Sequence, residues 1–391
     1  MKENSLRWFV LGIFVLSSAI NYLDRQSLAI LAPLLRAEFH LNYQQYGFIL
    51  TAFSIAYAAC APFAGLLIDR VGLNRAIMLA VAVWSMAGIA TGFTAGLAGL
   101  VICRAVLGVA EAAGIPAAGK AIHQYLLPPE RALGNALNQT GVSLGLVLAP
   151  PIATWIAVRH GWRAAFIVTG LLGLLWIPLW HWASRLSSAA PPPKEPLRQD
   201  IGILRSPRLW GFVGANALSM IGYSLWTNFT PSYLVDVHRL TLVEAAWYSW
   251  IPFAFAALGG FAGGWLSLRW IQRGAGAIAA RTRVCLAAAL VSLATAAIPL
   301  LPSPAWSAAG ISVSMFAVAA FSVNMYTMPL DTFGGAHAAF AVSILVAAYG
   351  GIQAVISPAF GALIDHHGFA PVCRIAAFTP LAAYGVLKWT E

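Results

Sequence analysis

Residues 65–72 read Gly-Leu-Leu-Ile-Asp-Arg-Val-Gly, and Arg75 follows three positions later. This stretch covers the end of one long apolar run, at 44–68, and the start of the connection to a second, at 75–95. Its two glycines permit a tight turn, and its charged residues are placed to pair at the ends of the flanking helices. A weaker copy at 264–269 reads Gly-Trp-Leu-Ser-Leu-Arg, with leucine where the first copy has aspartate. This recurrence predicts two related halves, each with a tight loop between apolar helices.

The whole chain is far more apolar than a water-soluble protein. Of its 391 residues, 60% are hydrophobic and 9% are charged, whereas soluble domains carry about 25% charged residues. The apolar runs are continuous and long enough for membrane-spanning helices, unlike the short alternating segments of an outer-membrane barrel. We therefore expect an all-α integral membrane protein in a lipid bilayer.

The apolar runs predict twelve transmembrane helices, six in each half. Their expected ranges are 7–34, 44–68, 75–95, 98–125, 132–158 and 162–184, followed by 208–235, 242–268, 281–301, 305–330, 336–363 and 370–388. Between the halves, a polar and proline-rich segment at 186–207 cannot span a membrane. We interpret it as a cytoplasmic linker between a six-helix bundle over 1–185 and a second bundle over 208–391.

The formal net charge of +10 is explained without a nucleic-acid partner. Cytoplasmic loops of membrane proteins collect Lys and Arg, and most basic residues outside the predicted spans fall on the side of the N-terminus. This asymmetry places both termini in the cytoplasm. The four cysteines form no CxxC pair, and no phosphate-binding loop, dinucleotide fingerprint or catalytic triad is present. We expect no metal, no cofactor and no enzymatic activity.

The stretch at 65–72 resembles the loop signature of the major facilitator superfamily. Five further segments, found in order along the chain, are similar to its anion:cation symporter branch: Asn-Tyr-Leu-Asp-Arg at 21–25, Arg104-x-x-x-Gly108-x-x-Glu111, Pro-Pro-Glu-Arg-Ala at 128–132, Gly-Trp-Arg-x-x-Phe at 161–166 and Pro-Ser-Tyr-Leu at 231–234. The resemblance implies the major facilitator fold and a monomeric, multi-pass carrier in a bacterial inner membrane. It also implies a loop that takes part in conformational change, formed by Gly65, Asp69, Arg70, Gly72 and Arg75.

Four ionisable residues lie deep inside the predicted spans: Asp24, Arg25, Arg104 and Glu111. An unpaired charge at the centre of a membrane helix costs roughly 2.5–3.5 kcal/mol, so these side chains are expected to face the protein interior, pair or contact water. Arg104 and Glu111 share one helix face with Gly108 between them. At a rise of about 1.5 Å per residue, Asp24 and Arg104 lie at similar depths, which predicts a structural Asp24–Arg104 pair.

Arg25 is then left as a deep cation without a partner, available to an anionic substrate. Glu111 is left as the more isolated carboxylate, which makes it a candidate for proton binding. We therefore predict that Arg25 binds the substrate and that Glu111, with Asp24 as its partner, couples transport to protons. The alternative is a static charge cluster that only stabilises the packing of two helices.

Polar residues in other spans are candidate substrate contacts. Tyr22 lies three residues before Arg25 on a shared helix face, and the resemblance implies that this tyrosine contacts the substrate in sugar-acid carriers. Asn324 matches a polar position of hexuronate carriers, and Gln139 and Tyr349 are further candidates. For each of them, an interhelical hydrogen bond is an equally supported role.

The sequence thus predicts a secondary active transporter that imports a small organic anion, such as a sugar acid or another carboxylate, together with protons. Sugar-acid carriers tend to have glutamine directly after the glycine of the fifth helix, whereas Val142 follows Gly141 here. This difference favours a smaller or more apolar carboxylate. A proton-driven exporter of drugs or other amphipathic compounds is the alternative within the same fold, and the cation Arg25 beside Asp24 argues against it.

Overall fold

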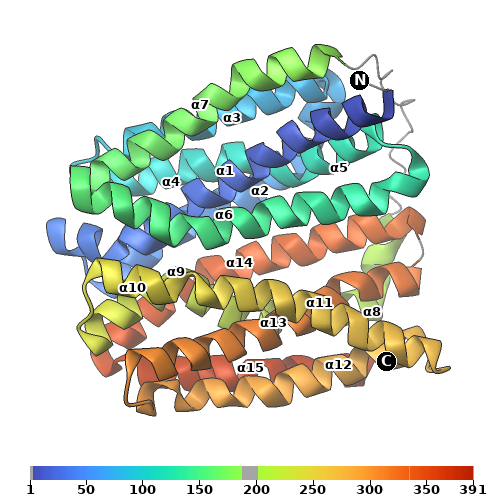
Figure 1. Cartoon of the computed structure of the whole chain (residues 1–391). Coiled ribbons are helices and arrows are strands. Elements are labelled where there is room, and N and C mark those ends of the chain that lie inside the picture. The colour runs from blue at the N-terminus through green and yellow to red at the C-terminus, as the bar shows by residue number, and fades with distance from the viewer. Residues whose placement is uncertain (1–2, 187–200, 334, 391) are drawn as a thin grey trace. The chain divides into compact units, whose positions relative to one another are not determined.

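The computed structural model describes residues 3–186, 201–333 and 335–390, and these residues are helical or form short connections, with no strand among them (Figure 1). The predicted all-α fold is confirmed. Contacts between Cα atoms divide the chain into two compact units. The first comprises Met1–Leu41 and Ile49–Pro196, and the second comprises Asn42–Phe48 and Leu197–Glu391.

The first unit is built almost entirely from the N-terminal half of the chain, coloured blue to green in Figure 1. Its helices are α1 (Glu3–Glu38), α2 (Tyr43–Val71), α3 (Leu73–Thr91), α4 (Leu97–Glu111), α5 (Gly114–Tyr125), α6 (Arg131–His160) and α7 (Trp162–Leu186), with the 3₁₀ turn η1 (Pro128–Glu130) before α6. α1 packs mainly on α6 and α7, and α3 packs on α7 and α4. Large buried aromatic side chains fill the core, where the rings of Trp176 and Trp180 stack at 5.5 Å.

The second unit contains the C-terminal helices, coloured yellow-green to red in Figure 1. They are η2 (Ile201–Arg205), α8 (Pro207–Ser219), α9 (Ile221–His238), α10 (Leu242–Ser249), α11 (Ile251–Gln272), α12 (Ala277–Ser292), η3 (Leu293–Leu300), α13 (Pro304–Phe333), α14 (Gly335–His367) and α15 (Phe369–Thr390). α13 packs mainly on α11 and α12, and α15 packs on α8. Its core is formed by apolar side chains that include Phe321, Met325 and Leu345.

Most of the predicted spans are present as long apolar helices. Among the described residues, ten helical segments are long and apolar enough to cross a bilayer, and a bent pair within α2 raises this number to eleven. The remaining predicted span, 208–235, is divided at Met220 into α8 and α9 and is not among them. The structure is therefore that of a multi-pass membrane protein.

Prolines explain why some predicted spans are divided into two helices. The span predicted at 98–125 is interrupted after Glu111, between α4 and α5. Pro116 lacks a backbone N–H, and a proline ring clashes with the carbonyl four residues earlier, which here belongs to Ala112. In the same way, Pro252 follows the break between α10 and α11. The first break leaves Glu111 at the C-terminal end of α4.

The predicted linker, 186–207, lies largely outside the described residues, since 187–200 are not part of them. Residues 201–205 form η2, and Ile203 is buried in the core of the second unit. The indole Nε1 of Trp210 also donates a hydrogen bond of 2.8 Å to the carbonyl oxygen of Leu204. The C-terminal end of the predicted linker is thus packed with the second unit.

Candidate functional site

Two adjacent charged residues, Asp24 and Arg25, lie near the middle of α1 in the first unit. Successive residues of an α-helix point about 100° apart, so neighbouring side chains contact different helices. Arg25 contacts residues of α2 and α4, whereas Asp24 contacts residues of α3 and α7. The two side chains therefore connect α1 to four other helices of the same unit.

Arg25 forms an ion pair with Glu111. Its Nε donates a hydrogen bond of 2.7 Å to Oε2 of Glu111, and a terminal nitrogen of the guanidinium lies 2.6 Å from the same oxygen. The side chain of Glu111 is fully buried and that of Arg25 is 27% exposed. The predictions that Arg25 has no partner and that Glu111 is isolated are therefore wrong. Spacing along one helix cannot reveal that α1 brings Arg25 to Glu111 of α4.

Three aromatic rings surround the Arg25 guanidinium. Its central carbon lies 4.8 Å from the ring centroid of Tyr22, 4.8 Å from that of Phe53 and 5.2 Å from that of Tyr57. Phe53 and Tyr57 are four residues apart on α2, and their rings stack at 5.7 Å. The predicted proximity of Tyr22 to Arg25 is thus present. Phe53 and Tyr57 were missed by sequence reasoning, although their i, i+4 spacing is that of a shared helix face.

The Asp24 carboxylate has a different set of neighbours. Its Oδ1 accepts a hydrogen bond of 2.9 Å from the Thr169 hydroxyl, and its Oδ2 makes no hydrogen bond with the described part of the chain. A Cβ on Gly88 would lie 3.0 Å from Oδ2, so the carboxylate is packed against the backbone of α3. Arg104, buried in α4, attracts this carboxylate electrostatically. The purely structural role of the Asp24–Arg104 pair stays a prediction.

Gly108 sets the distance between α4 and α2 beside this site. A Cβ at this position would lie 2.5 Å from the carbonyl oxygen of Phe53, which is too close for a Cβ atom. The missing side chain allows α2 to approach α4 and brings Phe53 to the Arg25 guanidinium. The glycine between Arg104 and Glu111 is therefore a packing requirement of the site.

We predict that Gly108→Ala destabilises the protein by about 1–3 kcal/mol, because overpacking forces backbone or rotamer shifts. The matched control is Gly114→Ala at the start of α5, where a Cβ would meet nothing within 4 Å among the described residues. Thermal unfolding of the purified protein in detergent measures the difference. Equal midpoints for the two variants would contradict the close packing of α2 on α4.

The aspartate of the loop motif at 65–75 pairs with a residue outside the motif. Asp69, at the end of α2, forms an ion pair with Lys120 of α5. Arg70 and Arg75 are exposed. Gly72 has a φ of +90°, in the left-handed region that favours glycine, and it separates α2 from α3. The motif thus connects the end of α2 to α5 through a side chain that lies outside the motif itself.

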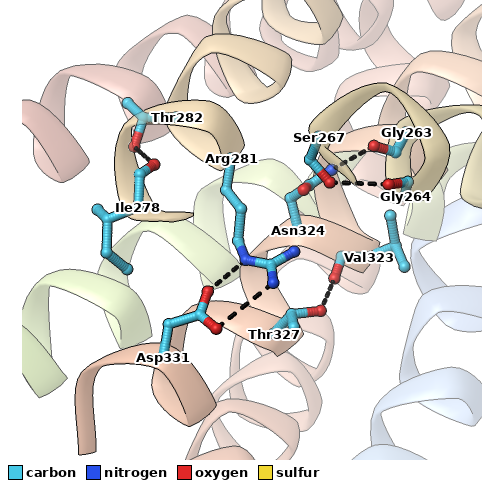
Figure 2. Close-up of polar contacts among 10 residues, drawn as sticks. All are labelled: Gly263, Gly264, Ser267, Ile278, Arg281, Thr282, Val323, Asn324, Thr327 and Asp331. Atoms are coloured by element: carbon cyan, nitrogen blue, oxygen red, sulfur yellow. Dashed lines mark hydrogen bonds and ion pairs between the residues drawn. The ribbon is translucent and has the colours of Figure 1, made fainter. Parts of the chain in front are cut away.

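The second unit contains its own polar cluster, shown in Figure 2. The Nδ2 of Asn324 donates to the carbonyl oxygens of Gly263 at 3.2 Å and Ala320 at 2.9 Å, which connects α13 to α11. Arg281 of α12 forms an ion pair with Asp331 of α13. The amide nitrogen of Asn324 is thus used in helix packing, and its role as a substrate contact stays a prediction.

The other two predicted substrate contacts, Gln139 and Tyr349, lie on α6 and α14. Gln139 is exposed on α6, whereas its neighbour Asn138 is buried and accepts a hydrogen bond of 2.8 Å from Ser18 of α1. Tyr349 is half-buried on α14 in the second unit. Arg25, Glu111 and Tyr22 come together in the first unit, and the roles of Gln139 and Tyr349 as substrate contacts stay predictions. Among the described residues, no three His, Cys, Asp or Glu side chains come together as metal ligands.

Long apolar helices around buried, paired charges define a multi-pass membrane transporter. The chain belongs to the Major Facilitator Superfamily, whose family profile matches residues 14–358. It is 28% identical to the hexuronate transporter of Escherichia coli (strain K12), over 100% of this chain and 94% of that protein. It is also 28% identical to the galacturonate transporter of Dickeya chrysanthemi, over 68% of this chain and 83% of that protein.

A solved structure supports the same fold. A bacterial homologue of the human lysosomal transporter Spinster superposes with a TM-score of 0.79, covering 98% of this chain and 95% of that chain at 22% identity. At this level of identity the likeness concerns the fold alone. The predicted superfamily is confirmed, and the two relatives described above are transporters of sugar acids.

Proposed function

We propose that this protein is a proton-coupled carrier that imports a small organic anion, such as a sugar acid or another carboxylate. The observation that carries the proposal is the ion pair of Arg25 with the fully buried Glu111. Three aromatic rings surround the guanidinium of this pair. The relatives named as hexuronate and galacturonate transporters support the class of substrate. We further propose a bacterial inner membrane, a monomer, and both termini in the cytoplasm.

The geometry supports competition between two carboxylates for one guanidinium. The side chain of Arg25 is partly exposed while that of Glu111 is not, so we propose that an anion approaches Arg25 from its exposed side. When Glu111 takes up a proton, it loses its charge and its attraction for Arg25, and the guanidinium is then able to bind a substrate carboxylate through two parallel hydrogen bonds. When the proton leaves, Glu111 competes for Arg25 again and the substrate is released. One proton and one anion therefore bind together.

Asp24 provides a second carboxylate in the same unit for this cycle. Its Oδ2 is buried and has no hydrogen-bond partner in the described part of the chain, while Arg104 attracts the carboxylate as a whole. A buried oxygen without a partner is costly, and a proton on it would turn it into a donor. We propose that Asp24 is the partner of Glu111 in proton coupling. We also propose that Tyr22 contacts the substrate, because its ring lies beside the Arg25 guanidinium.

Uptake by proteoliposomes tests this function. The purified protein is reconstituted, and radiolabelled D-galacturonate and a panel of other carboxylates are offered with an imposed pH gradient, alkaline inside. We expect accumulation of at least one carboxylate that ceases when a protonophore dissipates the gradient. Accumulation that is indifferent to the gradient would contradict proton coupling, and uptake of amphipathic cations without any carboxylate would contradict the substrate class.

The two-bundle organisation predicts that the covalent connection is dispensable. Residues 1–190 co-expressed with 201–391 should retain measurable uptake, because the second fragment keeps Ile203, which is buried in the core of the second unit. Co-purification of the fragments verifies assembly, and uptake by proteoliposomes measures the outcome. Assembled fragments without any uptake would show that the connection itself is needed for transport.

A further inference from the structure

The C-terminal end of α14 carries a close copy of the stretch at 65–72. Residues 361–368 read Gly-Ala-Leu-Ile-Asp-His-His-Gly, with both glycines and Leu-Ile-Asp at the same spacing. The backbones agree as well, since Gly72 and Gly368 have φ values of +90° and +71°. Each donates its N–H to the carbonyl four residues earlier, at 3.0 and 2.9 Å. Two equivalent segments therefore end α2 and α14.

In the copy on α14, the aspartate binds the N-terminus of α2 within the second unit. The backbone N–H of Tyr43 donates to Oδ1 of Asp365 at 2.8 Å, and that of Gln44 donates to Oδ2 at 2.9 Å. Asn42 accepts from the N–H of Gln45 at 2.7 Å. The first N–H groups of a helix have no intrahelical partner and carry partial positive charge. Asp365 satisfies two of them and Asn42 satisfies the third.

The glycine of this copy packs against the same turn. A Cβ on Gly361 would collide with the carbonyl of Tyr43 and lie 2.6 Å from Cα of Gln44. The ring of Tyr43 lies 5.5 Å from that of Phe369, and its hydroxyl donates to Asp236. Both the glycine and the aspartate of residues 361–368 are thus required for contact with the first turn of α2.

The corresponding residues of the first copy, at 65–72, have different contacts. A Cβ on Gly65 would meet nothing within 4 Å in the described part of the chain. Asp69 is 44% exposed and forms an ion pair with Lys120 rather than with backbone N–H groups. The copy at 361–368 therefore binds a helix N-terminus, whereas the copy at 65–72 does not. A segment of this sequence pattern can thus fold without being bound to a helix N-terminus.

The helix bound by residues 361–368 is shared between the two units. Asn42 and the first two turns of α2, to Phe48, belong to the second unit by their contacts, and from Ile49 onward α2 belongs to the first. Carriers built from two halves work largely by rigid movement of one half against the other. Such a movement must separate the start of α2 from Asp365, bend α2 or unfold part of it.

We propose that residues 361–368 form a releasable cap for the N-terminus of α2, bound in this structure and released when the two units move. Two hydrogen bonds to one carboxylate are a contact that can be broken and re-formed without unfolding either helix. The inference goes beyond the proposed function, because it requires movement of the units and no particular substrate or coupling ion.

Spin-label distance measurements test the cap without any substrate. Labels on Gln44→Cys and His366→Cys occupy two exposed positions beside it, in a background where the half-buried Cys60 and Cys103 are alanine. In lipid nanodiscs, we expect a main short distance and a minor longer one. Asp365→Ala should raise the ratio of long to short about fivefold to thirtyfold, the range for loss of a helix N-cap. Asp365→Asn, which keeps one acceptor oxygen, should give an intermediate ratio.

Gly361→Ala tests the packing half of the proposal, since its methyl group collides with backbone atoms of α2. It should raise the same ratio, whereas Gly385→Ala on α15, where a Cβ would meet nothing within 4 Å of the described residues, should not. Each variant is first shown to be monodisperse after purification. Identical distance distributions in the parent, Asp365→Ala and Gly361→Ala would overturn the proposal. Altered distances support the cap whether or not uptake is retained, because loss of uptake bears on the transport function.

Discussion

Glu111→Gln should abolish accumulation of the substrate anion against its gradient while exchange of that anion across the membrane continues. Glutamine has nearly the shape of the protonated carboxyl group, so Arg25 remains available to the substrate, but no proton is carried. A gradient of one pH unit corresponds to about 1.4 kcal/mol per proton and sustains about tenfold accumulation for each proton carried. The accumulation ratio of the variant should therefore fall from about 10 to about 1. Counterflow and gradient-driven uptake in the same proteoliposomes measure the two activities.

The sign of the pH dependence follows from the same competition. In the parent protein, lower pH protonates Glu111 and frees Arg25, so anion binding should strengthen as pH falls. In Glu111→Gln this dependence should be absent, and binding should be tight across the range. Glu38→Gln is the matched control, because Glu38 forms an exposed ion pair of 2.9 Å with Arg163, and exposed pairs contribute little. If Glu111→Gln still concentrates the substrate, Asp24 becomes the group to replace next.

Arg25→Lys should weaken anion binding by about 100-fold or more, even though it preserves the positive charge. Lysine cannot offer two parallel N–H groups to a carboxylate, and its ammonium does not stack on rings as the planar guanidinium does. Truncating one partner of a buried, hydrogen-bonded charge pair costs about 2–5 kcal/mol, so Arg25→Ala should weaken binding by roughly 30- to 5,000-fold. Arg25→Ala also leaves the fully buried Glu111 without the donor that now satisfies its Oε2.

Arg163→Lys provides a close match for this experiment. Arg163 also forms an ion pair with a glutamate and lies over an aromatic ring, at 4.4 Å from the centroid of Trp162, but its side chain is 46% exposed. Replacement there should leave substrate affinity unchanged. Equilibrium binding of the radiolabelled anion to purified protein compares the two variants. Unchanged affinity in Arg25→Ala would remove Arg25 from the substrate site.

The residues of the site differ in how far the sequence could predict them. Asp24, Arg25, Arg104 and Glu111 are visible at once, because charges inside long apolar runs are rare and costly. Tyr22 follows from its three-residue distance to Arg25. Phe53 and Tyr57 carry no such mark, since aromatic side chains are common in apolar helices and only the approach of α2 to α4 at Gly108 brings them to the guanidinium.

The cap on α2 shows that a sequence motif does not predict the partners of its charged residue. The repeat of 65–72 at 361–368 can be read in the sequence, but its two aspartates have different partners, Lys120 for Asp69 and the N–H groups of Tyr43 and Gln44 for Asp365. The residues shared by the two stretches give the same left-handed glycine and the same last turn. The partner of the aspartate depends on which helix end lies next to it.

By itself, the sequence determined the all-α architecture, most of the spans and the set of buried charges. Apolar run length and the high cost of unpaired polar groups in a membrane leave few other solutions. The tertiary structure alone decided that Arg25 binds Glu111 rather than standing free, while Asp24 bonds to Thr169. Spacing along a helix fixes which face a side chain occupies and how deep it lies. Which neighbour it meets depends on the rotation and close approach of packed helices, and these follow from side chains distant in the sequence.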